Sequence, residues 1–149
     1  MTNPGASWLL IASTLTFGCG GGGSDGLGPE DLSFTAEERL RAPDDRLGAA
    51  ANESVVGIGI GGTLAGGLCG YTVHPTGQVS GTSLSLTVEL RPRSGVPPCL
   101  PAEYVIVYGA LFRDLTPGET YMVRVVHIRQ PGNEVTVPFE GPVSVCCTQ

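Results

Sequence analysis

A proline–glycine turn followed at once by a run of β-forming residues constrains this chain more than any other feature. Pro117 fixes φ near the value that the first central position of a turn needs, and Gly118 tolerates positive φ at the next. Residues 120–128 then predict a strand, in which successive side chains point to opposite faces. The face better suited to the core carries no guanidinium and consists of Tyr121, Val123, Val125 and His127.

The pattern Leu-x-Pro-Gly-x-x-Tyr-x-Val-x-Val over residues 115–125 resembles the corner before strand F of fibronectin type III and related immunoglobulin-like domains. In that family the tyrosine ring packs in the core and its hydroxyl bonds to upstream backbone, an arrangement called a tyrosine corner. The resemblance assigns these roles to Leu115 and Tyr121. A similar pattern occurs in transthyretin-like and collagen-binding-B-type modules, which are also sandwiches. The resemblance implies an all-β fold, a single antiparallel immunoglobulin-like β-sandwich of about six to seven strands.

Composition agrees with many short strands, because the 149 residues include 23 Gly and 12 Pro and no long helical periodicity. The cleanest alternation lies at residues 83–90, where apolar and polar side chains take turns. Gly57-x-Gly59-x-x-Gly62 matches a dinucleotide-binding fingerprint in form, but no helix can follow it, so we expect a glycine-rich strand. Strands are expected at residues 54–60, 71–74, 83–90, 103–112, 120–128, 134–139 and 142–146.

The N-terminus carries an apolar run over residues 8–18, too short to span a bilayer but suited to a signal peptide. It ends in Leu15-Thr16-Phe17-Gly18-Cys19, which resembles a bacterial lipobox, after which the cysteine becomes the lipidated first residue. We therefore expect a signal peptide over residues 1–18 and a palmitate-type anchor on Cys19. An ordinary cleaved secretory signal and a cytosolic chain are the alternatives.

Residues 19–52 are rich in Gly, Ser, Asp, Glu and Pro, and such a segment buries too little surface to order itself. We expect a flexible, disordered acidic tether there and the folded domain over residues 53–149. Thr35-Ala36-Glu37-Glu38 matches a helix capping box. A short helix from Ala36 to about Arg41 is therefore one alternative, and a solvated spacer with a fraying turn is the other.

Four cysteines remain after Cys19, an even number that predicts two disulfides in an exported chain. Three pairings are open. The pairing that joins adjacent Cys146 and Cys147 closes a strained ring. Cys69 and Cys99 are therefore each expected to pair with one of these two C-terminal cysteines. The spacing lacks the Cys-x-x-Cys pattern of a zinc site. The four residues are Cys69, Cys99, Cys146 and Cys147.

The strand expected at residues 103–112 is apolar on both faces, so alternation alone does not choose its core face. In one alternative its tyrosines lie outside and form an exposed contact patch for a protein partner. In the other, the tether or a second sheet covers them. The patch would consist of Tyr104, Tyr108, Val126 and Ile128.

Catalysis needs titratable groups that converge, and no such set is visible, so no residue is assigned a catalytic role and no cofactor is expected. An enzyme would need a deep pocket lined by arginines and carboxylates. The net charge of −6 and the absence of lysine disfavour nucleic acid as a partner. His74 and His127 could converge at one end of the sandwich, which leaves a small ligand- or metal-binding protein as an alternative function.

These features predict an exported, lipid-anchored β-sandwich that serves as an interaction or structural module in the bacterial cell envelope. Gly20 follows the lipid cysteine in place of the Asp that favours inner-membrane retention, so the outer membrane or cell surface is expected. A secreted or periplasmic soluble protein is the alternative.

Overall fold

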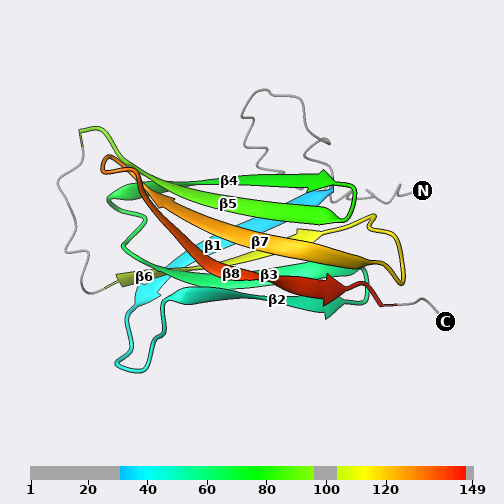
Figure 1. The fold of residues 1–149 in the computed structure, drawn as a ribbon. Helices are drawn as coiled ribbons and strands as arrows, with labels where there is room; N and C mark the ends of the chain where they lie inside the picture. The colour runs from blue at the N-terminus through cyan, green and yellow to red at the C-terminus, as the bar shows by residue number, and fades with distance from the viewer. Residues whose placement is uncertain (1–30, 96–103, 147–149) are drawn as a thin grey trace, which may run out of the picture.

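Two stacked four-stranded sheets make up the part of the chain that the computed structural model describes, residues 31–95 and 104–146 (Figure 1). Sheet A has the strand order β1-β6-β3-β2 and sheet B the order β4-β5-β7-β8. The all-β sandwich predicted from the sequence is confirmed. The strands are β1 (Leu32–Leu40), β2 (Gly48–Ser54), β3 (Gly57–Ala65), β4 (Tyr71–Ser80), β5 (Ser83–Pro92), β6 (Tyr104–Phe112), β7 (Thr120–Arg129) and β8 (Glu134–Ser144).

One pair of neighbouring strands is parallel, so the expectation of a wholly antiparallel sandwich is wrong. The hairpins β2–β3, β4–β5 and β7–β8 are antiparallel, whereas β5 and β7 run side by side in the same direction. The chain leaves sheet B after β5 to form β6 in sheet A and then returns as β7. The described strands number eight, one more than the upper limit expected.

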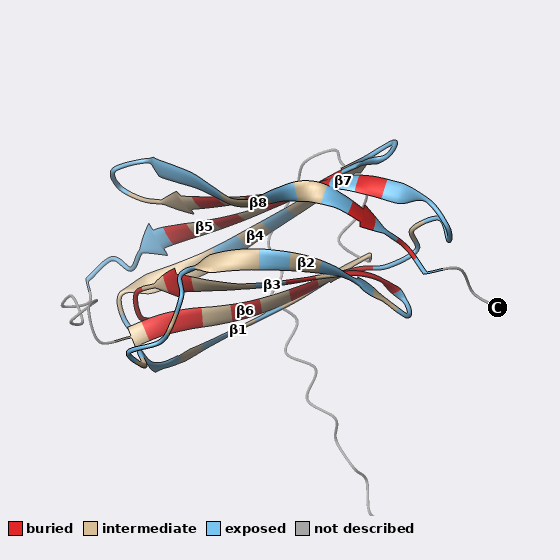
Figure 2. Ribbon diagram, turned by 60° about the horizontal axis from the view of Figure 1, so that its bottom comes forward, coloured by how far each residue is buried: buried red, intermediate tan, exposed pale blue. Residues whose placement is uncertain are grey.

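Alternating side chains build the core between the two sheets. On β5, Leu84, Leu86, Val88 and Leu90 are at most 1% exposed, while the serine, threonine and glutamate between them face away from the core. The same alternation appears along β6 and β7 as red bands in Figure 2. The predicted strand at residues 83–90 and its core face are therefore confirmed.

Sheet A begins with residues that the sequence analysis assigned to a tether, and that part of the prediction is wrong. Residues 32–40 form β1, antiparallel to β6, and no helix begins at Ala36. The reason is a period-two pattern in which Leu32, Phe34 and Ala36 face the core and the polar residues between them face out. Pairing with β6 satisfies the backbone, so the local capping signal has no effect. The expected leader, residues 1–18, lies outside the described residues.

Two further boundaries differ from the prediction. The first predicted strand of the domain is shifted and becomes β3, and β2 precedes it in the same sheet. The strand predicted at residues 71–74 is longer, because β4 continues through Pro75 to Ser80 along the edge of sheet B. An edge strand tolerates proline because the missing amide faces away from the ladder. The glycine-rich strand expected in place of a dinucleotide site is confirmed.

Tyr121 makes the hydrogen bond that defines a tyrosine corner. Its side chain is 5% exposed, and its hydroxyl accepts a hydrogen bond of 3.1 Å from the backbone N–H of Thr116. Leu115 packs half-buried against the core, and Gly118 has a φ of 79°. The corner therefore fixes the crossing from β6 in sheet A to β7 in sheet B.

Tyr108 lies in the core and not on the surface, which overturns the predicted patch. The even-numbered residues of β6 face inward, and Tyr108 is 3% exposed. Its ring stacks on that of Phe34 from β1, at 5.6 Å between centroids. On the other side it packs directly over Gly62 of β3, where any Cβ would overlap the ring. Strands β6 and β7 also belong to different sheets, so Tyr104 and Tyr108 cannot lie beside Val126 and Ile128.

This packing predicts opposite effects for two adjacent glycines. Gly62→Ala should lower the free energy of unfolding by about 1–3 kcal/mol, because the new methyl group displaces a buried ring. Gly61→Ala, on the outer face of the same strand, should be neutral or slightly stabilising, because its Cβ would meet no atom closer than 3.9 Å. Urea denaturation of both variants measures the difference, and equal destabilisation would contradict the close approach of Tyr108 to Gly62.

Candidate functional site

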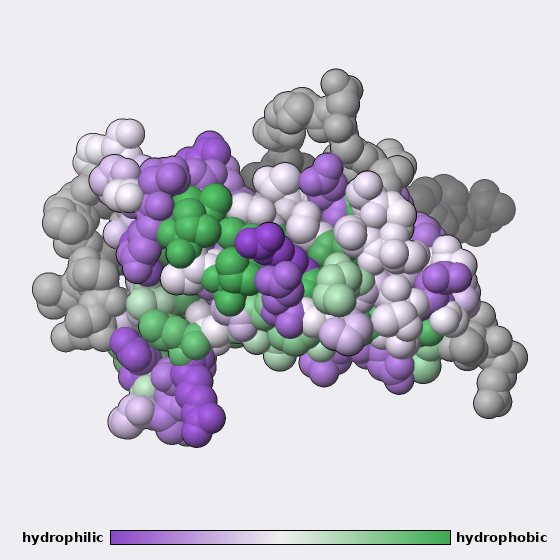
Figure 3. Space-filling model, viewed as in Figure 1, coloured by the Kyte–Doolittle hydropathy of each residue, from purple (hydrophilic) through white to green (hydrophobic). Residues whose placement is uncertain are grey.

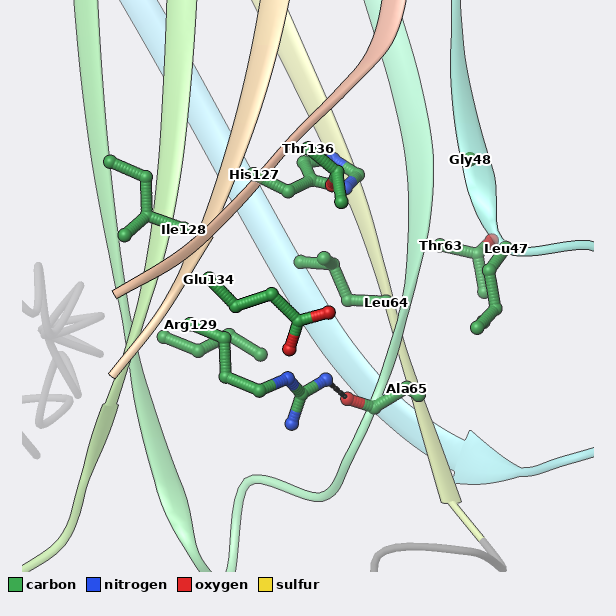
Figure 4. Close-up of a pocket in the computed structure, with 11 residues that line it drawn as sticks. Leu47, Gly48, Thr63, Leu64, Ala65, His127, Ile128, Arg129, Glu134 and Thr136 are labelled. Carbon is green, nitrogen blue, oxygen red and sulfur yellow. Dashed lines mark hydrogen bonds between the residues drawn. The ribbon is translucent and has the colours of Figure 1, made fainter. Parts of the chain in front are cut away.

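A cavity of about 290 Å³ opens at the end of the sandwich where β3, β5 and β7 finish and β2 and β8 begin (Figure 4). Side chains from both sheets line it. Its apolar wall comes from Leu47, Leu64 and Leu90. Its polar side chains are Thr63, His127, Arg129, Glu134 and Thr136. This volume lies at the lower end of the range for small-molecule sites, about 300–1,000 Å³.

A bulge in β8 decides which side chains enter this cavity. Val125 pairs with Phe139 and His127 pairs with Thr136, so two residues of β8 lie opposite one residue of β7. The extra residue reverses the faces of the strand on its N-terminal side. Glu134 therefore points inward with Thr136.

The same bulge turns two valines outward. The odd-numbered positions of β8 from Phe139 to Val143 face the core, and uninterrupted alternation would bury Val135 and Val137 as well. Instead these valines are 52% and 40% exposed. Pro138, which has no amide hydrogen to donate, lies at the bulge, where the ladder is already interrupted.

His127 is the deepest polar group of the site. It is 6% exposed, its Nε2 lies 2.7 Å from the hydroxyl oxygen of Tyr108, and the two rings meet edge to face at 5.6 Å. Burial lowers the pKa of His127 from 6.5 to about 4, and burial also raises the pKa of Tyr108 above its ordinary value. Both groups are therefore neutral near pH 7.

The hydrogen bond to Tyr108 leaves the other ring nitrogen of His127 facing the cavity. Nδ1 has no hydrogen-bond partner within residues 31–95 and 104–146. Every fully buried side-chain nitrogen or oxygen in these ranges does have one. Nδ1 is therefore not fully buried, and it is open to the cavity. Among the described residues the buried Tyr108 hydroxyl has no other hydrogen-bond partner, so we assign it as the donor to Nε2. The proton of the imidazole then resides on Nδ1, which offers an N–H donor.

Two opposite charges stand at the mouth of the cavity. Arg129 donates to the carbonyl oxygen of Ala65 and lies over the ring of Tyr71, 5.4 Å from its centroid. Glu134 pairs with Arg129 in the strand register and points into the same space (Figure 4). Among the described residues the ion pairs are Arg39–Asp45, Arg91–Glu89 and Arg124–Glu140, so neither Arg129 nor Glu134 has an ionic partner there.

Sequence reasoning did not identify Arg129, Glu134 or the cavity. A signal for Arg129 was present, because the alternate positions of β7 that face inward include His127, and the next such position is Arg129. No comparable signal existed for Glu134, since simple alternation along β8 places it outside.

His74 and His127 do not converge, and this removes the geometric basis of the predicted metal or ligand site at the two histidines. His127 points between the sheets, whereas His74 is exposed on the outer face of β4, where its Nε2 lies 2.9 Å from the Thr72 hydroxyl. In the described ranges no group of three or more His, Cys, Asp or Glu side chains lies close enough to hold a metal ion.

The described cysteines lie at opposite ends of sheet A. Cys69 follows β3, and its amide donates to Glu38 at 3.4 Å. The Sγ of Cys146 lies 3.3 Å from Glu53, which pairs with the start of β3. The nine residues of β3 span roughly 26 Å at about 3.3 Å per residue, whereas disulfide Cα atoms lie within about 7 Å.

This separation is too large for a bridge between Cys69 and Cys146, one of the two partners expected for Cys69. Cys19, Cys99 and Cys147 themselves lie outside the described residues.

The outer face of sheet B carries an exposed apolar strip, which we define as Val126, Ile128, Val135 and Val137. Val126 and Ile128 are half-buried, and the two valines of β8 are exposed. Figure 3 shows hydrophobic side chains gathered over β7 and β8 on this face, beside a strongly hydrophilic group. Arg124 and Glu140, 4.0 Å apart, lie further along the same face.

The fold and the cavity together define a two-sheet β-sandwich with a small polar-floored pocket at one end. Comparison of the chain with protein-family models, with curated proteins and with solved structures found no match. The part of the chain that the structure describes contains no helix long and apolar enough to cross a membrane.

Because His127 is buried, we expect the free energy of unfolding to fall in acid. Its pKa is lower in the folded state, so below pH 6.5 the unfolded state binds the proton more tightly. The contribution of neutral His127 to the free energy of unfolding is complete above pH 6.5 and falls as the pH drops to about 4. Urea denaturation between pH 7.5 and pH 4, compared with the variant His127→Gln, measures this part of the pH dependence.

The glutamine variant should have a flatter profile over that interval, because it can still accept the Tyr108 hydrogen bond but does not titrate. His74→Gln, which removes the imidazole on the outer face, serves as the matched control and should keep the steep profile of the parent protein. Parallel profiles for the parent and His127→Gln would contradict the assignment.

Proposed function

We propose that this chain is an exported β-sandwich module, anchored by lipid at Cys19, that acts through contact with another protein of the bacterial cell envelope. The anchor rests on the apolar run and the lipobox-like end of residues 8–19. A module of this kind needs a rigid scaffold and an exposed contact surface.

The observation that carries the proposal is the apolar strip on the outer face of sheet B. Burying a valine side chain fully is worth about 1.5–3 kcal/mol, and simple alternation along β8 would place Val135 and Val137 inside. The bulge leaves both exposed beside Ile128. Exposed apolar side chains that are contiguous, with charged residues around them, are typical of protein contact surfaces.

We further propose a disulfide between Cys69 and Cys99. The segments on either side of Cys99 both bond to the β3–β4 connection that holds Cys69: the Arg93 amide donates to Gly70 at 2.9 Å, and the Gly66 amide donates to Tyr104 at 3.0 Å. The short segment that contains Cys99 is therefore held at both ends, at Arg93 and at Tyr104, close to Cys69.

The anchor and the disulfide are tested by mass spectrometry of the protein extracted from the membrane fraction of a bacterial host. The expected mass is that of the chain cleaved before Cys19 with acyl chains attached. A digest without reduction should yield one linked pair of peptides that contain Cys69 and Cys99. The variant Cys19→Ser should lose the acyl mass and the membrane fractionation. A full-length chain with free thiols would overturn both proposals.

The contact surface is tested by site-specific photo-crosslinking in the same host. A benzophenone amino acid at Val135 should give a discrete crosslinked product, because this position lies in the apolar strip. The same probe at Thr76, exposed on the polar part of the same outer face, is the matched control. The additional substitution Val137→Glu should reduce the Val135 product about tenfold. Equal products from both positions, or none from either, would contradict a partner at this face.

A further inference from the structure

The cavity at the end of the sandwich combines features that a packed core avoids. Arg129 and Glu134 stand at its mouth without forming an ion pair, although they lie opposite each other in the register. Behind them Nδ1 of His127, a residue only 6% exposed, faces the same space. A guanidinium and a carboxylate that do not pair with each other, beside an apolar wall, are complementary to a molecule that carries both charges and an apolar part.

We propose that this cavity binds a small zwitterion with an aliphatic side chain, the chemistry of a free aliphatic amino acid. The guanidinium of Arg129 receives the carboxylate, and the carboxylate of Glu134 receives the ammonium group. The aliphatic side chain lies against Leu64 and Leu90. This inference stands on the cavity alone and does not depend on the contact surface of sheet B.

The position of Arg129 suits a carboxylate. Its bond to the Ala65 carbonyl and its stacking on Tyr71 hold the guanidinium in one orientation and leave other N–H groups to donate. A carboxylate bound there accepts charge-assisted hydrogen bonds, which are roughly twice as strong as neutral ones. The Nδ1–H of His127 provides a further donor deeper in the cavity.

The position of Glu134 excludes the simpler classes of ligand. A plain anion at Arg129 would lie close to the Glu134 carboxylate, and a plain cation at Glu134 would lie close to the guanidinium, so each would meet a like charge. A wholly apolar ligand would leave both charges partly desolvated without a partner. A zwitterion satisfies both groups, and the limited volume of the cavity restricts it to a small one.

The test is a titration of the ¹⁵N-labelled full-length protein with L-leucine, followed by NMR. We expect saturable shifts at the amides of Leu64, Arg129 and Thr136. Glycine, isobutyrate and isobutylamine, which lack the side chain, the ammonium or the carboxylate, should bind at least tenfold more weakly. Isobutyrate binding as tightly as leucine would overturn the assignment to zwitterions, as would the absence of saturable shifts with leucine.

Two substitutions on the same strand separate binding from folding. Glu134→Gln should weaken leucine binding about tenfold, and the fold should persist, because this exposed side chain forms no hydrogen bond or ion pair with the other described residues. Glu140→Gln removes a carboxylate from the outer face of β8 and should leave leucine binding unchanged. Equal effects of the two substitutions would overturn the role of Glu134.

Discussion

The hydrogen bond between Tyr108 and His127 is the polar contact on which the packing of the two sheets depends. Tyr108 belongs to sheet A and His127 to sheet B, and the bond crosses the core between them. The ring of Tyr108 also touches Phe34 on one side and lies over Gly62 on the other, so one side chain joins β1, β3, β6 and β7. An alternative packing would leave a phenol and an imidazole buried without partners, which costs about 1–3 kcal/mol for each unsatisfied group.

The sequence predicts the sandwich where alternation is strict and local. At residues 83–90 and 120–128 each side chain indicates its own face, and the structure agrees. The N-terminal strands escaped prediction because β1 carries both a capping box and an alternating pattern, and only pairing with β6 decides between them. The parallel pairing of β5 with β7 was also beyond local reasoning, since it depends on where the chain returns after β6.

The candidate site was less predictable than the fold for a related reason. The sequence allows two histidines to converge, yet His74 on β4 and His127 on β7 lie on opposite faces of sheet B. Arg129 extends the inward series of β7, but an arginine at the end of a strand is ordinarily assigned to solvent. Glu134 enters the cavity only because of a bulge, and nothing in the alternation of β8 announces one.

The β8 bulge links the two proposed surfaces through a single change of register. With continuous alternation, Val135 and Val137 would fill the end of the core, the apolar strip would keep only Val126 and Ile128, and Glu134 would lie outside the cavity. The chain instead exposes two valines, which forgoes the stabilisation of burying them, and it places a carboxylate at the mouth of the cavity. Departures from local rules that lower stability are found where a protein binds something. Because one bulge produces both departures, deleting it would be expected to bury Val135 and Val137 and to move Glu134 out of the cavity while leaving the rest of sheet B in place.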